Sequence, residues 1–213
     1  LLTAVSTGVV APFMSNLVGG NSARVLVVTV ITSILVPFTL PAVIGVVLSK
    51  SVSFSFWQML RMLALAIFVP IVAVQTLRRF APRLLEAANR RSYPVNLFLF
   101  ACINLGVFSK YADIFHSHPG LIAEACLVDI VLAAVYAVVG ILFFHRSAVE
   151  DRLAGAVMLA HVNNVLLIVF SSRFFGPAET MTSAMYLVPF FAIVLPLRYY
   201  GERARGRAQA VGG

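Results

Sequence analysis

Polar side chains that could bind an ion or an anion cluster in the middle of the apolar segment 153–170. This segment carries His161, Asn163 and Asn164, whose imidazole and amide groups can coordinate a cation or donate hydrogen bonds to an anion. On a helix Asn163 and Asn164 point about 100° apart, so an opened turn or a wide cavity is needed to hold both. The alternative is packing, because polar side chains join transmembrane helices for about 0.6 kcal/mol each.

A second polar cluster lies in the apolar segment 1–18. It reads Ser6-Thr7-Gly8-Val9-Val10-Ala11-Pro12-Phe13-Met14-Ser15-Asn16. Pro12 has no amide donor and disrupts a helix one turn upstream, so it should free backbone carbonyls near Gly8. A freed backbone group in hydrocarbon must find a partner inside the protein. Two such clusters in oppositely running helices favour a binding site where the helices cross.

The segment 25–48 adds three hydroxyl groups. Thr29, Thr32 and Ser33 occupy positions i, i+3 and i+4, so they share one face of a helix. Bonding to carbonyls of their own helix is the alternative role. Together with the two clusters, this face gives the candidate substrate- or ion-binding residues, which are Pro12, Ser15, Asn16, Thr29, Ser33, His161, Asn163 and Asn164.

Asp129 lies well inside the apolar segment 121–144. An ionisable residue within a membrane span is a functional candidate by default, so Asp129 is the candidate coupling acid of a transport process. An ion pair with Lys110 or Arg173 is the alternative.

Catalytic and metal-binding patterns are weak in this sequence. It contains neither a nucleophile elbow nor a phosphate-binding glycine loop nor a pair of acid/base carboxylates, so we expect no enzyme activity. His161 has no Cys, Asp or Glu neighbour at ligand spacing. A metal site at Asp113, His116 and His118 is a weaker reading than a solvated loop. We expect no cofactor. Sodium is one candidate coupling ion, and proton-linked or uncoupled transport is the alternative.

The composition predicts an integral membrane protein. Of 213 residues, 61% are hydrophobic and 11% are charged, whereas soluble domains carry about 25% charged residues. The net charge of +8 comes from Lys and Arg between apolar runs, which argues against nucleic acid as a partner and for the lipid bilayer.

Seven apolar segments approach the length of about 20 residues that a spanning helix needs. Most loop Lys and Arg fall on one side of the resulting topology, which predicts a cytoplasmic C-terminus in a cell membrane, inner or plasma. The basic loop 78–94 could hold a short interfacial helix. We expect a transmembrane domain over 1–200 and a basic cytoplasmic tail over 201–213. The segments are 1–18, 25–48, 56–77, 95–108, 121–144, 153–170 and 181–197.

The polar clusters resemble those of the bile acid:sodium symporter family. The resemblance rests on the stretch 6–21 with Thr29–Ser33 and Pro37, and on His161-Val162-Asn163-Asn164 followed by Arg173-Phe174-Phe175-Gly176-Pro177-Ala178. It implies an all-α, ten-helix fold of two inverted repeats in which the fourth and ninth helices are broken and cross. The segments 1–18 and 153–170 would be those two helices, and about three N-terminal helices would precede this chain.

Two departures from the family pattern concern sodium. The family's fourth helix carries a sodium-binding Ser-Asn pair, and Ser15-Asn16 are the same two residue types. Counting back from Gly20-Asn21, however, places Ala11-Pro12 at the position of that pair. The family's ninth helix carries a glutamate before the Asn pair, where this chain reads Met158-Leu159-Ala160-His161. The expected charge compensation for sodium is therefore missing.

These observations predict a secondary transporter of a small organic anion. The positive ends of broken helices would attract the anionic group. Thr29, Ser33, Asn163 and Asn164 would line the site, and His161 would take the place of a cation. The alternative is a non-transporting membrane receptor or scaffold that keeps the fold. No oligomeric state follows from the sequence.

Overall fold

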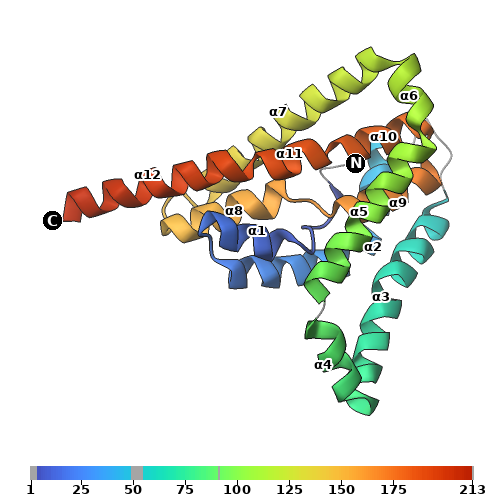
Figure 1. The fold of residues 1–213 in the computed structure, drawn as a ribbon, viewed down its shortest axis with the longest axis horizontal. Helices are drawn as coiled ribbons and strands as arrows, with labels where there is room; N and C mark the ends of the chain where they lie inside the picture. The colour runs from blue at the N-terminus through green and yellow to red at the C-terminus, as the bar shows by residue number, and fades with distance from the viewer. Residues whose placement is uncertain (1–3, 49–54, 91, 213) are drawn as a thin grey trace.

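The regular structure of the described residues is helical. A helix pairs the backbone N–H and C=O groups within one segment, which is necessary in a bilayer core where no water can bond to them. The computed structural model describes residues 4–48, 55–90 and 92–212. Figure 1 shows how the helices are arranged. In chain order they are α1 (Ala11–Val18), α2 (Ser22–Leu48), α3 (Phe56–Phe80), α4 (Pro82–Arg90), α5 (Ser92–Lys110), α6 (Ala112–Ser117), α7 (Pro119–Phe143), α8 (Val149–Ala160), α9 (Asn164–Phe174), α10 (Pro177–Met185), α11 (Leu187–Ala192) and α12 (Val194–Gly212).

Within the described residues, four helical stretches are long and apolar enough to cross a membrane. They are Ser22–Val47, Phe56–Phe80, Pro119–Phe143 and Pro177–Arg207. The helices Pro94–Lys110 and Asn164–Phe174 are apolar but shorter. The predicted count of seven spans is therefore not confirmed, and the ten-helix inverted repeat stays a prediction.

The two expected spans that carry polar clusters are broken. The segment 1–18 is α-helical only in α1, and its first three residues lie outside the described part of the chain. The segment 153–170 is divided between α8 and α9 by the residues 161–163. Breaks at these two places agree with the expectation from Pro12 and from the adjacent asparagines.

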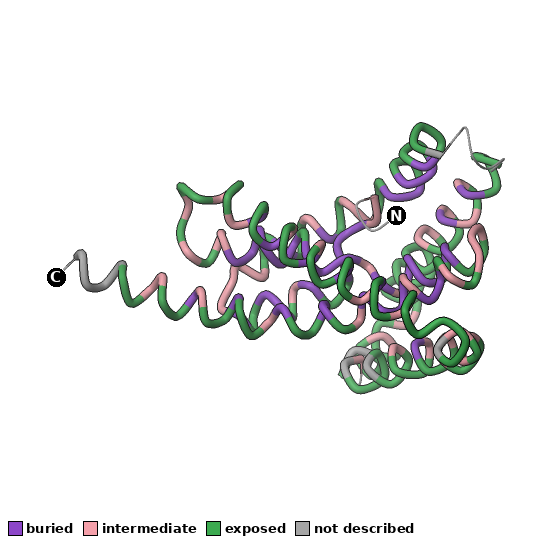
Figure 2. Tube along the Cα trace, turned by 90° about the horizontal axis from the view of Figure 1, so that it is seen from above, coloured by how far each residue is buried: buried purple, intermediate pink, exposed green. Residues whose placement is uncertain are grey.

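One core cluster lies where α1, α2, α7, α8 and the C-terminal helices meet, and a second joins α2, α3 and α9. Helices α3, α4 and α5 lie on the side away from the C-terminus (Figure 1). Away from these clusters many residues of the helices are exposed (Figure 2), and a large share of them are bulky apolar residues. Helix α3, for example, buries Met59 and Leu63 and leaves most of its length uncovered. Such surfaces fit contact with lipid tails, which are as apolar as leucine.

Small residues bring α7 and α8 into close contact. The buried face of α7 consists of Ala125, Asp129, Ala133, Ala137 and Gly140. A Cβ atom added to Gly140 would overlap the backbone of Gly155 on α8. Small residues at helix contacts are the usual device for close packing in membranes, and Asp129 lies on the same buried face of α7.

The predicted tail is helical. Helix α12 continues through residues 201–212. Arg205 donates a hydrogen bond of 2.8 Å to the carbonyl of Gly19, which ends α1 with a positive φ of 76°, and pairs with Glu150 at 3.4 Å. The tail is thus tied to the end of α1 and the start of α8. The basic loop also forms a helix, α4, as expected.

Candidate functional site

Local sequence explains where the two helices break. Helix α1 begins at Ala11, and Pro12 sits in its first turn, where a missing amide donor costs nothing. Helix α8 ends at Ala160, and α9 begins again at Asn164. The residues before α1 and between α8 and α9 must therefore find hydrogen-bond partners outside their own helices.

The two breaks provide those partners for each other. The amide of Gly8 donates to the carbonyl of His161 at 2.7 Å, and the amide of Asn163 donates to the carbonyl of Ser6 at 2.8 Å. Thr7 and Val162 face each other as an antiparallel bridge. Two unwound segments that are far apart in the sequence thus cross inside the molecule with their backbones paired.

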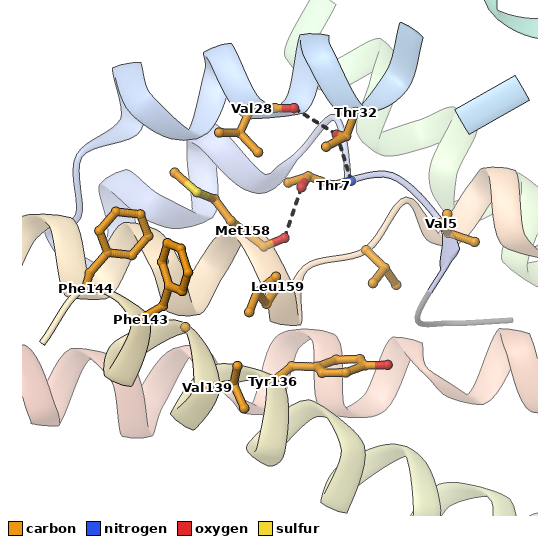
Figure 3. Close-up of a pocket in the computed structure, with 13 residues that line it drawn as sticks. Val5, Thr7, Val28, Thr32, Tyr136, Val139, Phe143, Phe144, Met158 and Leu159 are labelled. Carbon is orange, nitrogen blue, oxygen red and sulfur yellow. Dashed lines mark hydrogen bonds between the residues drawn. The ribbon is translucent and has the colours of Figure 1, made fainter. Parts of the chain in front are cut away.

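Two threonines hold the crossing to its neighbours (Figure 3). The hydroxyl of Thr7 donates to the carbonyl of Met158 in the last turn of α8 at 3.0 Å. The amide of Thr7 donates to the hydroxyl oxygen of Thr32 on α2 at 3.2 Å, and the Thr32 hydroxyl donates to Val28 at 2.8 Å. The helix α2, the crossing and α8 are therefore joined by one chain of hydrogen bonds.

Asn164 and His161 are buried beside the crossing. Asn164 is 3% exposed, and neither the oxygen nor the nitrogen of its side chain has a hydrogen-bond partner in the described structure. The ring of His161 packs edge-on against Phe190 at 4.8 Å between centroids, near the backbone of Val157. A buried amide without a partner costs about 1–3 kcal/mol, which marks Asn164 as a candidate ligand-binding group.

Asn163 has a structural task. Its side-chain oxygen accepts a hydrogen bond of 3.2 Å from the amide of Leu166 and caps α9. Such a cap is worth about 1 kcal/mol. Of the adjacent asparagines, Asn164 is therefore the one whose side chain remains unused.

The other candidate residues are spread along the helices. Ser15 and Asn16 lie in the second half of α1, which leads away from the crossing. Ser15 is buried against the turn at Gly20, and Asn16 is exposed. Thr29 donates its hydroxyl to Val25 of its own helix at 2.9 Å, and Ser33 is half-buried. Pro12 lies in the first turn of α1, a few residues after the crossing. The structure thus places His161, Asn163 and Asn164 at the break that takes part in the crossing.

A cavity of about 440 Å³ opens on one side of the crossing. Such a volume is typical of small-molecule sites. Its lining is mostly apolar, with hydroxyl groups from Thr7, Thr32 and Tyr136 (Figure 3). His161, Asn163 and Asn164 do not line it. The other lining residues are Val5, Val28, Val139, Gly140, Phe143, Phe144, Gly155, Met158, Leu159 and Val162.

Three residues with hydroxyl groups at the cavity were not among the predicted site residues. Thr7 and Thr32 belong to the polar clusters of the sequence, whereas Tyr136 lies in an apolar segment. A tyrosine seven positions after Asp129 lies on the same helix face as that acid. This spacing is the signal in the sequence that could have identified Tyr136 as a site residue.

Asp129 is 1% exposed and sits on α7 without a hydrogen bond or ion pair to any described residue. The expected alternative, pairing with Lys110 or Arg173, is not seen, because neither carboxyl oxygen of Asp129 has a described partner. The Lys110 ammonium lies over the ring of Tyr111 at 5.1 Å. Among the described residues, no group of three or more His, Cys, Asp or Glu could hold a metal ion.

Broken helices that meet inside a helical membrane protein are a feature of transporters built around discontinuous helices. The sequence matches the SBF-like CPA transporter family over residues 2–193. The chain belongs to this family, which is related to the bile acid:sodium symporters. The resemblance seen in the polar clusters is confirmed at this level, and membership implies a multi-pass membrane transporter rather than an enzyme. A search of curated proteins finds no match.

Proposed function

We propose that this chain forms the binding core of a secondary transporter for a small organic anion with an apolar body. The observation that carries the proposal is the backbone-paired crossing of the two helix breaks. Discontinuous helices that meet at mid-membrane are where such transporters bind substrates and ions.

The electrostatics of the crossing support an anionic group. Helices α1 and α9 both begin within a few residues of the crossing, and neither has an acidic residue in its first turn. The N-terminus of a helix carries about half a positive charge. The N-terminus of α1 has no side-chain cap, so no side chain there competes with a ligand. Asn164, at the start of α9, adds an amide donor.

The cavity supports an apolar body for the substrate. Its walls come from valine, leucine, methionine and phenylalanine side chains of α2, α7 and α8, while its hydroxyl groups include Thr7 and Thr32 at the crossing. An anion with an aromatic or aliphatic body would bury that body against the walls at about 25 cal/mol per Å².

A rival function is a non-transporting receptor or scaffold. The observation in its favour is the absence of an acidic residue in the turn Met158–His161 before the asparagines. The family's name and the two retained breaks favour transport.

The test is uptake into vesicles that contain the purified protein. Radiolabelled naphthalene-2-sulfonate is a suitable probe, because it stays charged at every accessible pH and has an apolar body. We expect saturable uptake, with inorganic sulfate a much poorer substrate. Asn164→Ala should abolish uptake in protein that still folds, and Asn163→Ala should mainly lower stability by about 1 kcal/mol.

Asn104 offers a matched control. It is a buried asparagine on α5, and its amide donates to Phe100 of the same helix at 2.8 Å. Asn104→Ala should leave uptake near normal. Normal uptake kinetics in the Asn163→Ala/Asn164→Ala double variant would overturn the assignment of the site.

A further inference from the structure

Asp129 is a buried acid that the proposed anion site does not use. It lies between Ala125 and Ala133 on the buried face of α7, and its carboxyl oxygens have no hydrogen-bond partner in the described chain. An ionised carboxylate in such surroundings, without a cation, costs several kcal/mol. Burial therefore favours the neutral form of the group in this conformation.

Tyr186 connects this acid to the helix break. It lies at the junction of α10 and α11, is fully buried, and donates its hydroxyl to the carbonyl of Ala160 at 2.8 Å. Ala160 is the last residue of α8 before the crossing. Helices α10 and α11, which meet at Tyr186, both pack against α7, the helix that carries Asp129 and the cavity residue Tyr136.

The groups around Asp129 include no described cationic partner. The other titratable residues of α7 are Cys126, Tyr136 and Glu124, which is exposed. Tyr186 lies at the junction of α10 and α11, and both of these helices pack on α7. At the C-terminal end of α8 the titratable residue is His161, which directly follows Ala160.

The charged residues of the helices packed on α7 lie at helix ends. On α8 they are Glu150, Asp151 and Arg152, which bond to Arg205, Arg24 and Ser147. On α10 the charged residue is Glu179 in the first turn, and it is exposed. Asp113 and His116 on α6 are exposed as well.

We propose that Asp129 is a proton-binding site within the membrane and that Tyr186 couples its occupancy to the break between α8 and α9. When the site opens, the carboxyl proton passes to water on that side, and the carboxylate is then stabilised by hydration. Loss of the proton places a negative charge on the face of α7 against which α10 and α11 pack, and the carboxylate then competes with the Ala160 carbonyl for the Tyr186 hydroxyl. The coupling to transport rests on the proposed function, whereas the proton site does not.

The proton site can be tested without a substrate. Dicyclohexylcarbodiimide is apolar and reacts with protonated carboxyl groups: the acid proton moves to a carbodiimide nitrogen, the carboxyl oxygen adds to the central carbon, and rearrangement leaves a stable N-acylurea. In vesicles containing the protein, we expect an adduct at Asp129 by mass spectrometry. Its rate of formation should fall about tenfold per pH unit above the midpoint.

Two variants separate a proton site from non-specific labelling of carboxyl groups. Asp129→Asn should remove the adduct, while Glu124→Gln, an exposed carboxyl on the same helix, should leave it unchanged. No adduct at Asp129, a rate that does not depend on pH, or protection by sodium but not by potassium would overturn the assignment.

Tyr186→Phe tests the coupling, because it removes the hydroxyl and keeps the ring. It should shift the pH midpoint of labelling, whereas Tyr199→Phe at an exposed position should not. An unchanged midpoint in folded Tyr186→Phe protein would overturn the role of Tyr186.

Uptake separates this inference from the proposed function. A proton gradient should change naphthalene-2-sulfonate uptake several-fold in wild type and in Glu124→Gln, but not in Asp129→Asn. An equal response to the gradient in Asp129→Asn would overturn the coupling. If wild type takes up no sulfonate, the proposed function and the coupling fail, and carbodiimide labelling still decides whether Asp129 binds a proton.

Discussion

The amide of Gly8 donates to the carbonyl of His161 at 2.7 Å, so a residue before the first helix and a residue between two later helices are bonded through their backbones. Each residue lies in a segment that cannot satisfy its own backbone groups. Their pairing removes a penalty of several kcal/mol for each unsatisfied group in an apolar interior. The crossing therefore stabilises the two breaks together, and neither break is expected to persist alone.

Gly8 should not tolerate a side chain. A Cβ atom at this position would lie 2.8 Å from the carbonyl oxygen of Val162 and 3.1 Å from that of His161. Because both neighbours are backbone atoms, the crossing would have to shift. Gly8→Ala should lower the free energy of unfolding by about 1–3 kcal/mol and reduce sulfonate uptake, as measured by thermal unfolding in detergent and by vesicle uptake.

Gly45 provides the control for this substitution. It lies in α2 with no atom within 4 Å of an added Cβ, so Gly45→Ala should be neutral or stabilising by about 0.5–1 kcal/mol. Equal effects at both glycines would contradict the importance of the close approach.

Thr32 should matter more than its position on α2 suggests. Thr32→Val keeps the shape of the side chain and removes the oxygen that accepts the Thr7 amide. A buried donor left without a partner costs about 1–3 kcal/mol, and this loss should appear in thermal unfolding. The exposed Thr39, which bonds only weakly to Leu35 of its own helix at 3.3 Å, is the control. A Thr39→Val variant as unstable as Thr32→Val would contradict the prediction.

The positions of the breaks could be predicted from the sequence because their causes are local. Pro12 removes an amide donor from one apolar segment, and two adjacent asparagines cannot share one narrow helix face in the other. Both features act within a turn or two. The predicted breaks and the structure agree for this reason.

The partners across the crossing could not be predicted, since they depend on contacts between distant residues. Thr32 and Thr29 differ little in sequence context, yet Thr32 bonds to Thr7 and Thr29 bonds to its own helix. Likewise, α9 begins at Asn164, so the side chain of Asn163 caps the helix and the side chain of Asn164 has no hydrogen bond to a described residue. A one-residue difference in where α9 begins would exchange these roles.

Sodium should have only a small effect on this protein. The neutral oxygens that could bind it are partly committed, because Asn163 caps α9 and the Thr29 hydroxyl donates to Val25. Exchanging potassium for sodium should therefore shift the thermal unfolding temperature little and change uptake only slightly. A saturable stabilisation by sodium near 2.7 kcal/mol, about that of a ligand at 100 times its Kd, would contradict this prediction and favour the family's sodium mechanism.

The last prediction concerns the membrane topology. Arg205 of α12 bonds to Gly19 and Glu150, which places the C-terminal helix, the end of α1 and the start of α8 at one end of the molecule. The distribution of Lys and Arg predicts that this end is cytoplasmic, together with Arg83 in the basic loop, and that Lys110 lies on the opposite side.

Single cysteines test this topology, after Cys102 and Cys126 are replaced by serine. The substitutions Arg83→Cys, Lys110→Cys and Arg207→Cys fall on exposed residues, and Arg207 is chosen so that the contacts of Arg205 stay intact. In intact cells, a membrane-impermeant maleimide should label position 110 and should label positions 83 and 207 only after permeabilisation. Labelling of positions 83 and 110 from the same side would contradict the predicted topology, because α5, which lies between them, would then not cross the membrane.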